Sequence, residues 1–345
     1  QRNGRRLDAG RAYLHDGQPR PNLTIVSNTT VERVLFEGRV AIGVSVRGKG
    51  GLTRISAKRE VILSAGAIAS PQLLMLSGIG NPPDLARIGI PVIVSAPEVG
   101  RNYQDHLDYT ANVRMKAPGL LAFTPLSLLR SALSIPAYRR GRGSLTTNVA
   151  EAGGFVKSAP DVERPDLQFH FTIGLVDDHT RRFHIGSGAA LHVCALRPKS
   201  RGVVTLANSD IATAPLIDPR FLSHPDDLAV MVRGAKIVHR IWQAAPLAKY
   251  NGKMLYGSLT AGDTEIKALI RSHADTIYHP VGTCRMGSDL QSVVDIELKV
   301  RGVEGLRVAD ASIMPALISG NTQAPSAMIG EKAADLILEK SVSPR

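Results

Sequence analysis

A histidine and an asparagine in the last quarter of the 345-residue sequence are of the types that carry out proton chemistry. His279 stands between Tyr278 and Pro280, and an imidazole is well suited to act as a base near neutral pH. A lone histidine beside a proline can equally be a buried, hydrogen-bonded residue. Asn321 either forms a turn or stands at the start of a helix, because Pro325 suits a first helical turn.

A carboxylate and five further histidines offer other chemistry. Glu151 precedes two glycines, in Ala150-Glu-Ala-Gly-Gly154. Such a residue is either a solvated loop carboxylate or a pocket group that attracts a cationic substrate. The five histidines form no helix-face pair with carboxylates, so a metal site is not expected. They are His106, His170, His179, His184 and His192.

The elements that must position these residues follow from hydrophobic periodicity. Short β-rich runs separated by turns predict an antiparallel meander, at residues 23–27, 31–36 and 40–46. An apolar run over 60–64, a turn of small residues and helical spacing after it predict strand, turn and helix. Further strands are expected at 90–94, 189–196, 202–206 and 306–309, and helices at 225–244, 264–273 and 325–338. Residues 100–142 show a weak pattern typical of loops and short helices.

The order of these elements predicts the fold class. Strands and helices alternate at both ends of the chain, whereas the middle is less regular. This arrangement favours an α/β (α+β) fold in which a nucleotide-binding domain is interrupted by a substrate domain.

Four motifs carry most of the information. The longest are Ser64-Ala-Gly-Ala-Ile-Ala-Ser-Pro-Gln-Leu-Leu-Met-Leu-Ser-Gly-Ile-Gly80 and Tyr278-His-Pro-Val-Gly-Thr-Cys-Arg-Met-Gly287, which continues through residues 305–315, 319–323 and 328–332. Between them lie Val99-Gly-Arg-Asn-Tyr-Gln-Asp-His106 and Leu196-Arg-Pro-Lys-Ser-Arg-Gly202. Together they resemble the motifs of the glucose–methanol–choline (GMC) oxidoreductases, near the choline dehydrogenase and alcohol dehydrogenase branch, over nearly the whole chain.

The resemblance implies an FAD-dependent enzyme that oxidises the CH–OH group of an alcohol by proton removal and hydride transfer to flavin N5. It assigns proton removal to His279 and a hydrogen bond to the substrate oxygen to Asn321. Glu151 is a weaker candidate for attracting a cationic alcohol such as choline. The implied FAD contacts are Val31 and Ala65 at the adenosine, Asp310 and Ala311 at the ribityl or diphosphate portion, and Thr322 and Gln323 at the flavin.

The implied domains are an FAD-binding domain of GMC type over residues 1–100 and 276–345 and a substrate-binding domain, with an antiparallel sheet and helices, over 101–275. Members of the family begin with a strand, a Gly-x-Gly-x-x-Gly turn and a helix that binds the FAD pyrophosphate, and the sequence holds no equivalent. We therefore expect a chain that is incomplete at its N-terminus, with the missing segment cleaved, disordered or present as a partner chain. The rival expectation is a non-catalytic fragment or subunit.

Charge, cysteine content and hydrophobic runs limit the kinds of partner and cellular setting that we expect. Residues 1–60 hold twelve Lys or Arg against five Asp or Glu, a large part of the net charge of +12. No RNA-binding or helix-turn-helix motif accompanies them, so nucleic acid is not expected as a partner. Two distant cysteines exclude a disulfide framework, and no apolar run is long enough to span a membrane. A soluble, cytoplasmic enzyme is expected, with an alcohol substrate and a quinone-like electron acceptor or oxygen.

Overall fold

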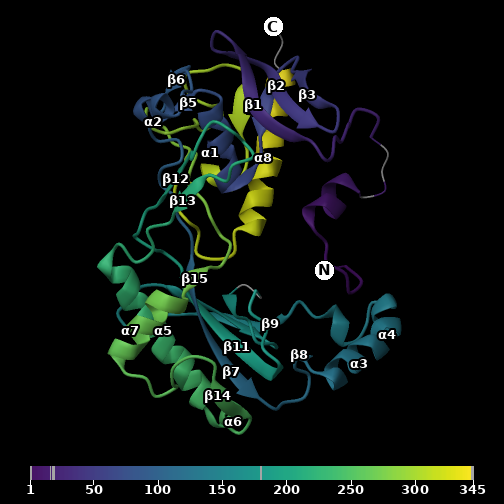
Figure 1. The fold of residues 1–345 in the computed structure, drawn as a ribbon, viewed down its shortest axis with the longest axis vertical. Coiled ribbons are helices and arrows are strands. Elements are labelled where there is room, and N and C mark those ends of the chain that lie inside the picture. Colours follow the sequence, from purple (N-terminus) through teal and green to yellow (C-terminus); the bar gives the residue numbers. More distant parts are fainter. Residues whose placement is uncertain (1, 16, 18–19, 179–180, 343–345) are drawn as a thin grey trace. The chain divides into compact units, whose positions relative to one another are not determined.

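The computed structural model describes residues 2–15, 17, 20–178 and 181–342, which form two compact units (Figure 1). We call the unit that contains both long motifs the motif unit. We call the other unit the sheet unit. The motif unit comprises Arg20–Asp105, Lys199–Ser223 and Tyr278–Arg345. The sheet unit comprises Gln1–Pro19, His106–Pro198 and His224–Ile277. That the two units serve FAD binding and substrate binding remains a prediction.

A three-stranded antiparallel sheet opens the described part of the motif unit. Its strands are β1 (Thr30–Glu37), β2 (Val40–Gly48) and β3 (Gly51–Ser56), in that order. The strands expected at 31–36 and 40–46 are confirmed, and β3 completes the meander. The strand expected at 23–27 is wrong. Its side chains are exposed and it pairs with no strand in the described structure, and β-propensity produces a strand only where a partner is present.

A parallel strand pair lies at the centre of the motif unit. Strand β4 (Val61–Leu63) pairs with β16 (Leu306–Val308), although the two are distant in sequence. After β4 a tight turn leads into α1 (Gly66–Leu76), and after β16 the chain enters the short helix η4 (Ala311–Ile313). Both predicted strands and the predicted helix are confirmed. The carboxyl ends of β4 and β16 therefore meet at one edge.

Helix α1 is almost entirely buried, as expected for a helix that is apolar on all sides. The C-terminal helix α8 (Gln323–Val342) begins two residues before the predicted start at residue 325. The remaining elements of the unit are short. They are β5 (Ile79–Gly80), α2 (Pro82–Arg87), β6 (Val94–Ser95), β12 (Val203–Thr205) and β13 (Leu216–Asp218).

The sheet unit, in its described residues, contains a seven-stranded antiparallel sheet. Strands β14–β7–β11–β10–β9 run in this order, while β15 pairs with β7 and β8 pairs with β11. Their bounds are β7 Leu107–Met115, β8 Ala122–Phe123, β9 Ala150–Val156, β10 Leu167–Thr172, β11 Gly186–Ala195, β14 Asn251–Met254 and β15 Asp275–Thr276.

Strand β7 falls where loops and short helices were expected, so that prediction is wrong for residues 107–115. Leu107, Tyr109 and Ala111 alternate with Asp108 and Thr110, which is the period of a strand. All five are buried or half-buried, because β7 lies inside the sheet between β14 and β11.

The sheet unit also contains helices, some of which pack against the sheet (Figure 1). Helix α5 (Pro225–Gln243) packs on β11, and a Cβ at Gly234 would come within 2.9 Å of a Val193 methyl, so a glycine allows the close approach. The other helices are η1 Gly10–Leu14, α3 Pro125–Leu133, α4 Ile135–Arg139, η2 Ser144–Thr146, α6 Ala245–Ala248 and α7 Asp263–His273. The predicted α/β (α+β) class, with an antiparallel sheet and helices, is confirmed. Within the described residues, every helix is too short or too polar to cross a lipid bilayer.

Candidate active site

His279 and Asn321 lie together in the motif unit. The ring atom Nε2 of His279 is 3.2 Å from Nδ2 of Asn321. An amide nitrogen only donates, so Nε2 is the acceptor in this contact and carries a lone pair. His279 is 7% exposed, whereas Asn321 is open to solvent. The pair therefore presents one acceptor and one donor side by side, which is the complement of an alcohol hydroxyl.

The backbone around His279 is held in an uncommon conformation. Tyr278, directly before it, has a φ of +66°, a left-handed value that costs free energy for any residue with a Cβ. The backbone N–H of His279 donates to Oδ1 of Asp105 at 3.0 Å. The Tyr103 hydroxyl donates to the other oxygen of the same carboxylate, also at 3.0 Å. A buried carboxylate thus fixes the residue that carries the imidazole.

The start of α8 fixes Asn321. Thr322 is buried directly before the helix, and its carbonyl oxygen accepts from the backbone N–H of Ser326 at 3.0 Å. The first N–H groups of a helix have no acceptor within it, and the helix N-terminus carries a partial positive charge. Here Gln323 and Ala324 carry such N–H groups, while Pro325 carries none. The pair formed by His279 and Asn321 is therefore followed by two backbone N–H groups at a helix N-terminus, which suit an electron-rich acceptor.

Asp310 joins the carboxyl ends of the two parallel strands. Its Oδ2 accepts from the backbone N–H of Gly66 at 2.8 Å and from the Ser70 hydroxyl at 2.5 Å. Its Oδ1 accepts from the backbone N–H of Ser312 at 2.8 Å. Gly66 has a φ of +85°, so the turn after β4 favours glycine. Asp310 therefore ties the turn after β4 to the turn after β16.

These arrangements fit an FAD site. Ala65, Asp310 and Ala311 lie at the carboxyl edge of parallel strands, where α/β sheets bind nucleotides. Thr322 and Gln323 follow Asn321 directly, and α8 contacts η4, which begins at Ala311. Val31 lies in β1, pairs with Val46 and packs half-buried against the same core. That these six residues touch FAD remains a prediction.

Cys284 lies in the same region but is chemically quiet. Burial raises the pKa of its thiol, and the negative charge of Asp310 raises it further. A thiol with a raised pKa stays protonated at neutral pH, and a protonated thiol is a poor nucleophile. Cys284 is therefore a core residue.

Glu151 lies in the sheet unit, in strand β9. It is exposed, accepts a hydrogen bond from the Thr147 hydroxyl, and lines a cavity of about 600 Å³ together with Phe171 and Tyr250. Its role towards a substrate remains a prediction. Among the described residues, no three His, Cys, Asp or Glu side chains are grouped as a metal site requires. Of the histidines considered for a metal, His179 lies outside the described residues.

Sequence reasoning did not identify Asp105 and Ser70 as residues that hold the site. Both stand inside motifs that the sequence shows, the Asp-His end of residues 99–106 and the stretch 64–80. Their partners are 174 and 240 positions away, respectively. Spacing along the chain cannot reveal contacts of this kind.

Comparison with known proteins agrees with this geometry. An N-terminal and a C-terminal profile, both described as GMC oxidoreductase, match residues 1–108 and 198–330. The chain is also 48% identical to an alcohol dehydrogenase [acceptor] of Pseudomonas putida, over 99% of the chain and 62% of that protein. The chain belongs to the GMC oxidoreductase family. The resemblance found in the motifs is thus confirmed.

Other GMC relatives and related structures are similar over most of the chain. The mitochondrial choline dehydrogenase of Homo sapiens is 43% identical, over 97% of the chain and 57% of that protein. The chain thus spans less than two thirds of the length of these curated relatives. Pyridoxine 4-oxidase from Mesorbium loti superimposes with a TM-score of 0.83 at 28% identity, covering 97% of the chain and 62% of that structure. A fungal aryl-alcohol oxidase superimposes with a TM-score of 0.82 at 26% identity, covering 99% of the chain and 65% of that structure.

A further similar structure is that of an FAD-dependent protein. An FAD-dependent oxidoreductase from Chaetomium thermophilum has a TM-score of 0.79 at 25% identity, covering 93% of the chain and 62% of that structure. FAD is therefore the cofactor that the GMC fold implies, and the site residues described above fit it.

Proposed function

We propose that this chain forms the catalytic part of an FAD-dependent oxidoreductase that oxidises the CH–OH group of a small alcohol. The observation that carries the proposal is the pairing of His279 with Asn321, which sets a hydrogen-bond acceptor beside a donor. The names of the relatives support the same reaction, since they include an alcohol dehydrogenase, a choline dehydrogenase and an aryl-alcohol oxidase. The substrate is a choline-like alcohol or an aliphatic or aromatic primary alcohol.

The two side chains divide the work on the hydroxyl group. The hydroxyl oxygen accepts a hydrogen bond from Nδ2 of Asn321, and its hydrogen points to Nε2 of His279. Nε2 takes the proton as the carbon–hydrogen bond breaks, so that the alkoxide never has to exist alone. Asn321 keeps donating to the oxygen while negative charge develops on it, which stabilises the transition state. When bound, FAD supplies the hydride acceptor at its N5.

Other residues hold the reactants. Ala65, Asp310 and Ala311 at the strand edge, with Val31, are proposed to hold the nucleotide part of FAD, and Thr322 and Gln323 the flavin. Glu151 is proposed to line the substrate pocket and to favour a cationic alcohol, because a carboxylate attracts positive charge. The electrons leave to a quinone-like acceptor or to oxygen.

Absorption spectroscopy tests the proposal. Protein titrated with FAD is expected to retain the visible flavin bands through gel filtration, and an alcohol added without oxygen is expected to bleach them. A protein that stays colourless with added FAD, or whose bound flavin no primary alcohol bleaches, would contradict it. Choline and benzyl alcohol make an informative pair, since only the first carries a positive charge.

A further inference from the structure

We propose that Asp105 is the positioning residue that holds His279 in its working orientation, with Asn102 and Gln104 completing a clamp. We call residues 102–105 the clamp segment. The inference rests on the proposed function of His279 as the base. Asp105 is 2% exposed, and both of its carboxylate oxygens accept hydrogen bonds from the motif unit, one of them from the His279 backbone.

Backbone hydrogen bonds align the clamp segment with the chain around His279. The N–H of Gln104 donates to the carbonyl oxygen of Val281 at 3.1 Å, and the N–H of Val281 donates back to Gln104 at 2.9 Å. Just before the clamp segment, the N–H of Gly100 donates to the carbonyl oxygen of Thr283 at 2.8 Å. The two stretches are thus paired like short antiparallel strands.

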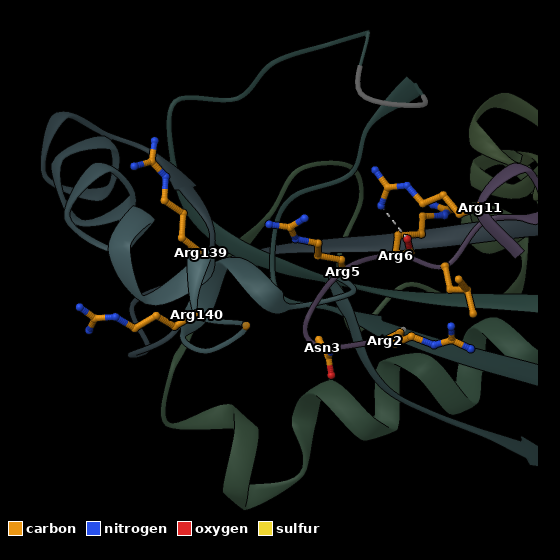
Figure 2. A pocket seen from close by; sticks show the side chains of 9 residues that line it. Arg2, Asn3, Arg5, Arg6, Arg11, Arg139 and Arg140 are labelled. Atoms are coloured by element: carbon orange, nitrogen blue, oxygen red, sulfur yellow. Dashed lines mark hydrogen bonds between the residues drawn. The ribbon is translucent and has the colours of Figure 1, made fainter. Parts of the chain in front are cut away.

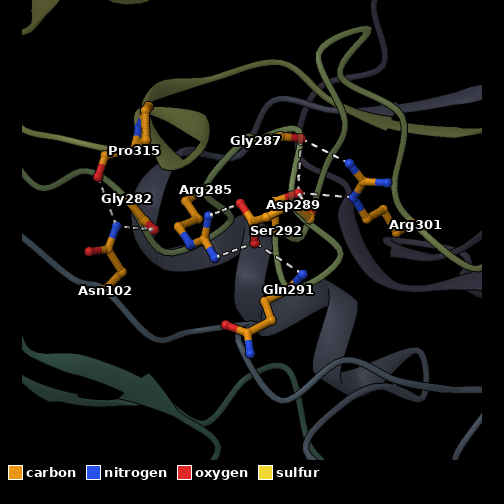
Figure 3. Close-up of polar contacts among 9 residues, drawn as sticks. All are labelled: Asn102, Gly282, Arg285, Gly287, Asp289, Gln291, Ser292, Arg301 and Pro315. Atoms are coloured by element: carbon orange, nitrogen blue, oxygen red, sulfur yellow. Dashed lines mark hydrogen bonds and ion pairs between the residues drawn. The ribbon is translucent and has the colours of Figure 1, made fainter.

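Side chains of the clamp segment extend this pairing towards Asn321. Nδ2 of Asn102 donates to the carbonyl oxygens of Gly282 and Pro315, each at 3.2 Å (Figure 3). Gln104 donates to the same Pro315 oxygen at 3.1 Å and accepts from the backbone N–H of Leu317 at 3.1 Å. The clamp segment therefore forms hydrogen bonds both with the chain that follows His279 and with the chain that leads to Asn321.

The left-handed residue before His279 explains why this grip matters. The backbone of Tyr278 is strained, because a φ of +66° is unfavourable for a residue with a Cβ. Such strain persists only where surrounding contacts fix the conformation. The next backbone N–H is the one that Asp105 accepts at 3.0 Å. Without that acceptor the turn is free to relax, and the imidazole moves with it. A displacement of about 1 Å is enough to lower turnover by about 10²-fold.

Two substitutions separate positioning from general stability. In the FAD-loaded protein, Asp105→Ala is expected to lower kcat about 10- to 100-fold while KM changes less than about threefold. Asp105→Asn keeps an acceptor for the His279 N–H and is expected to recover most of that loss. Adding Tyr278→Gly to Asp105→Ala is expected to recover part, because glycine adopts positive φ at no steric cost. Asp227→Ala, at a buried aspartate of α5, is the matched control.

Hydrogen exchange gives a readout that needs neither FAD nor turnover. In FAD-free protein, the His279 amide is expected to exchange about tenfold faster in Asp105→Ala than in wild type or Asp105→Asn, the factor for one net hydrogen bond. If the protein oxidises no alcohol, this measurement still tests whether Asp105 holds the His279 backbone. The proposed function and the proposed role of Asp105 can therefore fail independently. Tyr103→Phe removes one hydroxyl and serves if Asp105→Ala does not fold, with faster exchange expected. Wild-type exchange at His279 in Asp105→Ala or in Tyr103→Phe, or an unchanged kcat in Asp105→Ala, would overturn the inference.

Discussion

Nε2 of His279 lies 3.2 Å from Nδ2 of Asn321, although 42 positions separate the two residues in the chain. Because Asn321 donates through Nδ2, the contact holds Nε2 as an unprotonated acceptor. A hydroxyl group that replaces this contact would meet a partner for its oxygen in Asn321 and a partner for its hydrogen in His279. The direction of this contact distinguishes the effects of different Asn321 variants.

Asn321→Ala removes the donor to the substrate oxygen and is expected to lower kcat about 10²-fold, the usual effect of losing one such donor. Asn321→Asp is expected to be worse at neutral pH. Its carboxylate only accepts, so it favours the protonated imidazole, which is no longer a base. Steady-state kinetics of both variants, with FAD content measured alongside, provide the comparison. An aspartate variant more active than the alanine variant would show that the donor is not required.

Protonation of His279 is expected to abolish the reaction, because an Nε2 that carries a proton cannot accept another. The value of kcat/KM should therefore fall as the pH is lowered and the imidazole takes up a proton. The profile should be recorded with saturating electron acceptor and with circular dichroism as a control for folding. A profile that stays flat down to about pH 5 would place the base elsewhere.

Gly282, three positions after His279, lies against the clamp segment, and its replacement tests how tightly the two stretches are packed. Its φ is +92°, and a Cβ there would lie 2.5 Å from the carbonyl oxygen of Asn102. Gly282→Ala is expected to lower the free energy of unfolding by about 2 to 5 kcal/mol through strain and overlap. Gly38→Ala is the matched control, because its φ of +57° is also positive but a Cβ meets nothing within 4 Å. Gly38→Ala is expected to lower the free energy of unfolding by about 1 to 2 kcal/mol.

The measurement is urea unfolding followed by circular dichroism. Equal losses for the two glycine variants would mean that the chain around Gly282 can move aside, contrary to the packing described.

His239, in α5, makes stability depend on pH. Burial lowers the pKa of its imidazole, and the negative charge of Glu265 only partly opposes this. The contribution of neutral His239 to the free energy of unfolding is therefore complete above the pKa of an imidazole in the unfolded chain, about 6.5. It is lost as the pH falls below that value, because the unfolded chain then binds a proton more readily than the folded chain does. Melting temperatures of wild type should fall more steeply with acidification than those of His239→Gln. Parallel slopes would contradict this account.

The motifs singled out His279 and Asn321, which the fold brings together, and the sequence pattern predicted the strand, turn and helix over residues 60–76. Their chemistry is local to each motif, and the long apolar run of α1 and the buried strands β4 and β16 have patterns that stand out in a single sequence. Strand β7 could also have been predicted from its alternation of apolar and polar residues.

Other parts depend on contacts between distant residues. The bond from His279 to Asp105 joins positions 174 apart, and that from Ser70 to Asp310 joins positions 240 apart. Side-chain types allow many such pairings, and only the folded backbone selects one. Arg285 and Asp289 show the opposite case. Four positions apart, they form a two-point ion pair at 2.8 and 2.9 Å, which lowers the pKa of the Asp289 carboxyl (Figure 3).

Four of the basic residues near the N-terminus, Arg2, Arg5, Arg6 and Arg11, gather in one place within the sheet unit. Several arginines line a cavity of about 570 Å³ there, but their guanidinium groups point in different directions (Figure 2). They are Arg2, Arg5, Arg6, Arg11, Arg139 and Arg140. A phosphate group is bound best by donors that converge on it, and these guanidinium groups do not converge.

The rate at which an alcohol bleaches the bound flavin in a single anaerobic turnover tests the central claim most directly. The comparison is between wild type and His279→Gln, both loaded with FAD to the same extent. The account predicts that the variant is about 10² to 10⁴ times slower, the range for losing a general base. Equal bleaching rates in the two proteins would contradict the assignment of His279 as the base.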